Sequence, residues 1–139
     1  MNSKKIEFNS EEYALIIDGS KIPDGLKFYT SDDKFVQVAS WKYEEGKILD
    51  AHSHKICERT SNVTQEVVIV KKGSIKVKIF NNDEELIAEE IIKEGDILIQ
   101  FQGGHEYEIL EDDTEVFEVK NGPYPGLEKD KKVIGKKDA

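Results

Sequence analysis

Three histidines are the residues of this chain best suited to ligand or catalytic chemistry. His52 and His54 are separated by one residue, and His105 follows Gly103 and Gly104. On a β-strand, residues i and i+2 point to the same face, so the first two histidines would aim their rings at one point. Neutral imidazole is a common metal ligand. Metal binding is therefore the first hypothesis.

The residues around this pair continue the pattern. Glu66 opens the apolar run 67–70, and Gly73 ends it. The order resembles the first motif of the cupin superfamily: Gly46, five residues, His52-Ser53-His54, a spacer, Glu66, six residues and Gly73. The spacer, residues 55–65, is longer than the family's, which predicts an inserted loop at a barrel mouth. Glu58 would fit the usual spacer, but no glycine follows it at the right distance.

A second motif surrounds the third histidine. Gly95, Gly103, Gly104 and His105 are similar to the second cupin motif, with Phe101 in place of its proline and a turn one residue shorter. The resemblance covers about residues 46–119 and is to small single-domain bacterial and archaeal cupin-fold metalloproteins. It implies one divalent ion held by His52, His54, Glu66 and His105.

Three imidazoles and one carboxylate would suit Fe(II), Ni(II), Mn(II), Zn(II) or Co(II). The resemblance implies a metal-dependent enzyme of the oxygenase or the isomerase and epimerase type, acting on a small oxygenated metabolite such as a sugar derivative or an organic acid. Two alternatives stay open. One is a non-catalytic module that binds a metal or a small molecule, and the other is a metal-free structural cupin.

Further residues are candidates for substrate contacts. Arg59, the only arginine, could clamp a substrate carboxylate or phosphate, or be a solvated loop residue. Tyr107 is in phase with His105 and would face the interior, either moving protons or packing in the core. Gln100 or Gln102 could reach a metal-bound water.

The elements that must position these residues read as strands. Apolar and polar residues alternate with period two in several short segments separated by turn residues, which predicts antiparallel strands. The fold class expected is an all-β, single-domain cupin (jelly-roll) β-barrel. Residues 1–34 would supply N-terminal strands that pack on the barrel or on a dimer partner, 35–120 the barrel core, and 121–139 a loose or edge-packed tail.

The charge composition of the chain argues against some classes of binding partner. The net charge of −9 and the absence of a basic stripe argue against nucleic acid and an anionic membrane surface. The single cysteine, Cys57, suits a reducing compartment, and the first residues lack the apolar segment of a secretory signal, so a cytoplasmic location is expected. The expected partners are a small-molecule substrate or ligand and a second copy in a homodimer, because exposed barrel edges invite pairing.

Overall fold

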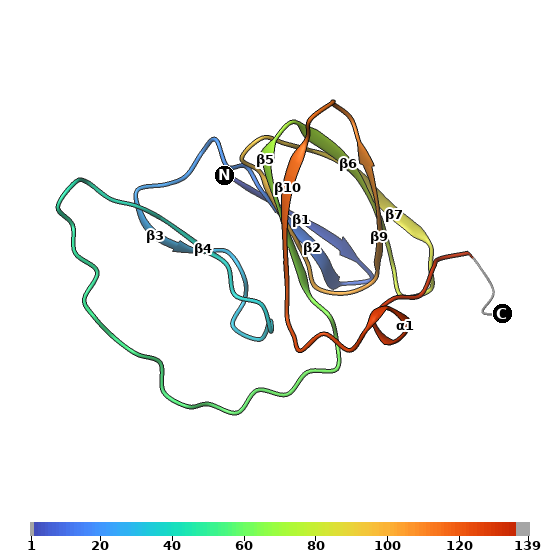
Figure 1. The fold of residues 1–139 in the computed structure, drawn as a ribbon, viewed down its shortest axis with the longest axis horizontal. Helices are drawn as coiled ribbons and strands as arrows, with labels where there is room; N and C mark the ends of the chain where they lie inside the picture. Colours follow the sequence, from blue (N-terminus) through green and yellow to red (C-terminus); the bar gives the residue numbers. More distant parts are fainter. Residues whose placement is uncertain (1, 136–139) are drawn as a thin grey trace.

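The computed structural model describes residues 2–135, which form antiparallel β-strands and one short helix (Figure 1). The elements in chain order are β1 (Ser3–Phe8), β2 (Glu11–Ile17), β3 (Gly25–Phe28), β4 (Ala39–Lys42), β5 (Glu66–Lys72), β6 (Ser74–Phe80), β7 (Leu86–Lys93), β8 (Ile97–Gln100), β9 (Gly104–Ile109), β10 (Glu115–Lys120) and α1 (Leu127–Asp130).

The strands are arranged in three sheets. The largest has the order β1-β2-β8-β5-β10, a second has the order β7-β6-β9, and β3 pairs with β4 alone. The prediction of an all-β, antiparallel fold is therefore confirmed. Within residues 2–135 the sheets do not join into a closed barrel, since β1 and β10 are the edges of the large sheet and β7 and β9 those of the three-stranded sheet.

The main core lies between the five-stranded and three-stranded sheets. Strand β6 shows how the sequence directs this packing: Ile75, Val77 and Ile79 are buried, and the residues between them are partly exposed. The large sheet contributes side chains from β5 and β8, including Val68, Val70 and Leu98. Burial of these β-branched and aliphatic side chains is the principal stabilisation of the sandwich.

The opposite face of the large sheet is also covered. Leu15, Ile17, Val67, Ile99 and Phe101 form a second cluster, against which residues of the segment 29–38 pack. Gln65 holds this segment in place, because its Oε1 accepts a hydrogen bond from the backbone N–H of Val36 at 2.8 Å. The central strands of the large sheet are therefore buried on both faces.

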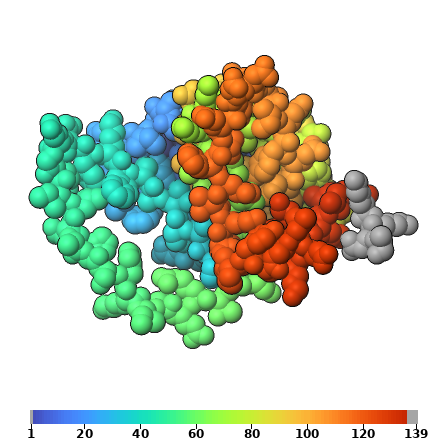
Figure 2. Space-filling model, in the orientation of Figure 1, coloured from blue at the N-terminus to red at the C-terminus, as the bar shows by residue number. Residues whose placement is uncertain are grey.

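The long connection between β4 and β5 departs from expectation. Residues 43–65 contain no strand, and the strand expected across His52 and His54 is absent; both side chains are exposed. The segment runs in a wide arc away from the sheets, and Figure 2 shows an opening between it and the body of the molecule. Unstructured loops this long are uncommon in compact domains and are often functional.

Both ends of the chain pack against the sheets. Strands β1 and β2 are part of the same sheet as β8 and β5. The expected tail, 121–139, is described as far as Gly135; within that range Ile134 packs against Gly104 on β9. In the described residues, no helix has the length and apolar character needed to cross a bilayer.

Candidate functional site

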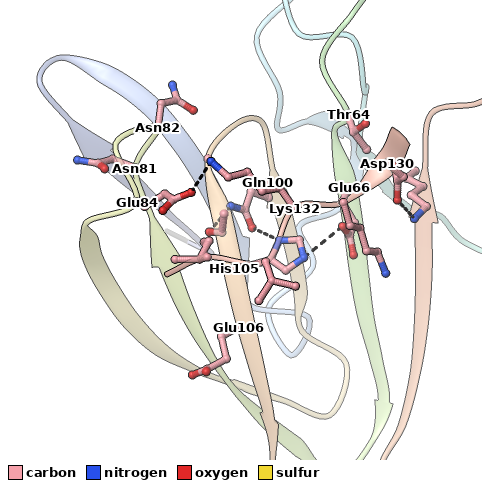
Figure 3. Close-up of a pocket in the computed structure, with 16 residues that line it drawn as sticks. Thr64, Glu66, Asn81, Asn82, Glu84, Gln100, His105, Glu106, Asp130 and Lys132 are labelled. Carbon is pink, nitrogen blue, oxygen red and sulfur yellow. Dashed lines mark hydrogen bonds and ion pairs between the residues drawn. The ribbon is translucent and has the colours of Figure 1, made fainter. Parts of the chain in front are cut away.

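A cavity of about 640 Å³ lies where four strands end beside the C-terminal segment (Figure 3). Strand pairing brings its polar residues together: Glu66, the first residue of β5, is opposite Gln100 on β8 and Lys120 on β10. His105 comes from β9 in the other sheet. The cavity is therefore assembled from both sheets, at one end of the interior between them.

Hydrogen bonds determine the tautomer of His105. The amide Nε2 of Gln100 donates to the carbonyl oxygens of Gln102 and Gly104, at 3.1 and 2.9 Å. Its Oε1 must then face His105, whose Nδ1 lies 2.8 Å away and donates to it. Burial lowers the pKa of His105, which favours the neutral ring. The lone pair of the neutral imidazole is consequently on Nε2.

That lone pair faces a carboxyl group. Oε2 of Glu66 is 3.6 Å from Nε2 of His105, and the Glu66 residue is 8% exposed. Its other oxygen, Oε1, is buried and accepts no hydrogen bond from the described residues. With Glu66 ionised, two acceptors face each other without a donor between them. The pair needs either a proton or a cation.

A second carboxylate increases the need for a proton or a cation beside Glu66. Burial, followed by hydrogen bonding to and repulsion from Glu118 on β10, raises the pKa of Glu66 to about 8. Glu118 keeps a lowered pKa, because it accepts the hydrogen bond that protonated Glu66 donates. Of the two carboxyl groups, Glu66 is therefore the one that holds a proton more readily.

Tyr107 extends the same face of β9. Its ring stacks on that of His105 with centroids 4.7 Å apart, which confirms that the two residues are in phase. Its hydroxyl is buried without a hydrogen-bond partner among the described residues, and burial followed by the charge of Glu66 raises its pKa. Tyr107 packs against the main core and is not among the residues that line the cavity, so its hydroxyl is an unused polar atom in the core beside His105.

The remaining predicted residues lie elsewhere. His52 and His54 are on the exposed arc, with their rings 5.3 Å apart, and Arg59 is an exposed residue of the same segment whose Nη1 donates to the carbonyl of Cys57 at 3.4 Å. Within residues 2–135, no three His, Cys, Asp or Glu side chains gather closely enough to hold a metal ion. The structure brings Glu66 and His105 together but leaves the two arc histidines apart from them.

Glu66 and His105 nevertheless fit a metal ion. Ligand atoms that share one transition-metal ion, at about 2.1 Å each, lie roughly 3–3.5 Å apart. The separation of 3.6 Å is close to this range. A metal-bound histidine commonly donates its other ring N–H to an oxygen acceptor, as His105 does to Gln100.

Glu118 is the site residue that the sequence did not predict. A weak signal was present, since Glu118 interrupts the otherwise apolar run of Val116, Phe117 and Val119. Either Gln100 or Gln102 was expected to reach a metal-bound water; in this structure Gln100 orients His105.

Replacement of Gln100 by leucine tests this orientation. Without the acceptor, the His105 ring loses the hydrogen bond that places its lone pair on Nε2, and we expect divalent-metal affinity to fall about 10- to 100-fold. The matched control is Gln102→Leu, which removes a neighbouring amide that does not contact His105. Equal affinities of wild type and Gln100→Leu, measured by calorimetry, would contradict the assigned role.

Comparison with protein-family models, with curated proteins and with solved structures found no match to this chain.

Proposed function

We propose that this protein is a cupin that binds one divalent transition-metal ion, with Glu66 and His105 as two of its ligands. The observation that carries the proposal is the pair of facing acceptors, Glu66 Oε2 and His105 Nε2, 3.6 Å apart, with Gln100 fixing the ring. The low-dielectric surroundings make an uncompensated pair of this kind costly, and a cation removes the cost.

The histidines of the arc supply the remaining ligands when the arc closes. Their rings are already in edge-to-face contact, with centroids 5.3 Å apart, and Nδ1 of His52 is 2.8 Å from the carbonyl oxygen of Asp50, which leaves Nε2 free for a metal. The connection from Lys42 to Glu66 contains 23 residues, so it is long enough to adopt a second conformation. The free energy of metal binding would offset the conformational entropy that this segment loses when it becomes ordered.

Strand β9 offers the arc a place to dock. Among the described residues β9 pairs only with β6, and its other edge is free. A segment that includes His52 and His54 would add to this edge by backbone hydrogen bonding, which is the usual way an exposed sheet edge is completed. That pairing would place both histidines beside His105 and would close the two sheets toward the expected jelly-roll barrel.

The metal would supply Lewis-acid chemistry, polarising an oxygen of a bound metabolite. In the metal-free protein Glu66 holds a proton near neutral pH, because its pKa is raised to about 8, and this proton would leave when Glu66 binds the ion. We extend the proposal to an enzyme of the oxygenase or isomerase type on a small oxygenated metabolite, as the resemblance to cupins implies. A non-catalytic metal-binding module is the alternative, and turnover of candidate metabolites separates the two.

The test is a metal titration of wild type and of His52→Ala/His54→Ala, using Mn(II), Fe(II), Ni(II), Co(II) and Zn(II) in competition with a chelator. We expect about one ion per wild-type chain and at least a 100-fold loss of affinity in the double variant. Ser53→Ala and Cys57→Ser are the controls, since Ser53 lies between the histidines and Cys57 is the exposed free thiol of the arc.

Hydrogen exchange reports the closure independently of affinity. Metal should slow exchange of the backbone amides of β9 and of residues 46–54 in wild type but not in the double variant. Metal binding with equal affinity in both proteins would show that the arc histidines are not ligands. Absence of binding in wild type would overturn the proposed metal function.

A further inference from the structure

The two-stranded hairpin of β3 and β4 turns a polar face toward the rest of the molecule. It lies on the side of the five-stranded sheet away from the three-stranded sheet (Figure 1). Lys27 is paired with Ser40 and shares this inner face with Tyr29. The Tyr29 hydroxyl lies 2.9 Å from Ser40 Oγ and accepts a hydrogen bond from Asn2 Nδ2 at 2.7 Å. Lys27 donates to Oδ1 of the same asparagine at 3.4 Å, so polar contacts attach the hairpin beside β1.

The opposite face of the hairpin is apolar. Leu26 is paired with Trp41, and Phe28 is two residues beyond Leu26, so the three side chains share this outer face. They are between 51% and 65% exposed, and Tyr43, just after β4, is 41% exposed. We call Leu26, Phe28, Trp41 and Tyr43 the hairpin face. A sheet that packs on a core on one side normally turns its apolar face inward, so this reversed arrangement indicates a partner on the outer side.

The hairpin face has the size that association of two copies requires. A fully buried aromatic side chain removes about 150–250 Å² of surface from water. At their exposed fractions, the three aromatic side chains of the hairpin face would bury roughly 300 Å² per copy. A stable interface buries about 800 Å² per partner, of which roughly 60% is apolar. With Leu26 added, the hairpin face supplies most of the apolar part of such an interface.

The charges beside the hairpin face favour a second copy of the chain as the partner. Lys42 Nζ pairs with Asp24 Oδ1 at 3.3 Å, and both side chains are largely exposed at the end of the hairpin. A two-fold axis places a surface against its own copy, so the surface of a dimer must complement itself. An apolar centre does so. The rim carries one charge of each sign, so Lys42 of one copy can meet Asp24 of the other.

We propose that the protein is a homodimer in which the hairpin faces of two copies pack against each other about a two-fold axis. Phe28 and Trp41 form the centre of the interface, because buried aromatic side chains contribute most to interface energetics. This assigns a surface to the homodimer expected from the sequence and does not depend on a bound metal ion. The expectation was pairing through exposed strand edges, whereas this interface uses the face of a hairpin.

Sedimentation equilibrium of the metal-free protein, with chelator present, measures the association. We expect wild type to have the mass of two chains at micromolar concentrations. In Phe28→Ser/Trp41→Ser the dissociation constant should rise at least about 100-fold, because each substitution removes a central aromatic contact from both copies. Phe117→Ser is the matched control, since Phe117 is exposed to a similar extent but belongs to β10. Far-ultraviolet circular dichroism checks that each variant is folded.

Fluorescence of the unsubstituted protein is a second measurement, because Trp41 is the only tryptophan of the chain. Dilution should shift its emission to longer wavelength as the dimer dissociates and Trp41 becomes exposed to water. Phe117→Ser should show the same shift, whereas Phe28→Ser should emit at the longer wavelength from a higher concentration downward.

Three results would overturn the hairpin-face dimer. They are a monomeric wild type, an unchanged dissociation constant in Phe28→Ser/Trp41→Ser, and a Trp41 emission that stays constant while the dimer dissociates. Each of these results leaves the proposed metal-binding function standing, because the measurements are made without metal. Conversely, failure of wild type to bind metal would leave the dimer interface unaffected.

Discussion

Replacement of Glu66 by glutamine is expected to weaken divalent-metal binding more than about 100-fold, because changes outside the ligand shell alone cost 10- to 100-fold. Glutamine has nearly the same shape but no negative charge. The residue is buried and forms part of the cavity wall, so the fold should tolerate the substitution. The control is Glu106→Gln, a cavity residue that pairs with Lys78 at 3.5 Å and is largely exposed.

The same substitution should change how stability depends on pH in the metal-free protein. The pKa of Glu66 rises from an ordinary value of 4.5 in the unfolded chain to about 8 in the folded protein. Between these values the folded state binds the proton more tightly, so the free energy of unfolding falls as pH rises through this window and levels off above pH 8.

In Glu66→Gln the free energy of unfolding should not fall with rising pH in this way. At pH 8.5 we expect the metal-free variant to be more stable than metal-free wild type by on the order of 1–2 kcal/mol, less than the full shift implies because the cavity admits solvent. Urea denaturation at pH 5 and pH 8.5, with chelator present, measures the difference. A variant less stable than wild type at pH 8.5 would show that Glu66 is compensated by a partner other than a proton or a metal.

Truncation of adjacent residues in β8 should destabilise the protein from both faces of the large sheet. Leu98 is 1% exposed and faces the three-stranded sheet, whereas Ile99 is fully buried on the other face, where the segment 29–38 packs. We expect Leu98→Ala and Ile99→Ala each to cost about 2–5 kcal/mol of unfolding free energy, because each leaves a cavity in a packed cluster.

Ile91→Ala on β7 is the matched control, since Ile91 is 55% exposed and should lose less than about 1 kcal/mol. Denaturation with urea at constant pH compares the three variants. A cost for Leu98→Ala alone would mean that the segment 29–38 does not cover the outer face of the large sheet in solution.

Much of the strand content follows from local pattern. The alternation of Ile75, Val77 and Ile79 with lysines predicts β6, and the phase of His105 and Tyr107 is borne out by their stacked rings. These predictions succeed because the side-chain direction in a strand repeats every two residues and depends on little beyond its neighbours. Glu66 was likewise expected to begin a strand, as it does in β5.

The strand expected across His52 and His54 is where the local pattern failed as a predictor. The apolar residues around His52 and His54, such as Ile48, Leu49 and Ile56, do not alternate with period two, so nothing in their own pattern anchors a strand. A strand there requires a partner edge, and in this structure the segment has none. The i, i+2 spacing therefore established that the two rings can act together, but not where they act.

The composition of the candidate site depended on the tertiary structure. Glu118 meets Glu66 because β10 pairs with β5, and Gln100 orients His105 across the two sheets. Lys131 reaches the cavity because Ile134 packs on Gly104. By itself, the sequence determined most of the strands and the residue types suited to metal binding, since these follow from local periodicity and side-chain chemistry. Which of those residues meet was decided by strand pairing and packing between segments distant in the chain, which leave no local signal.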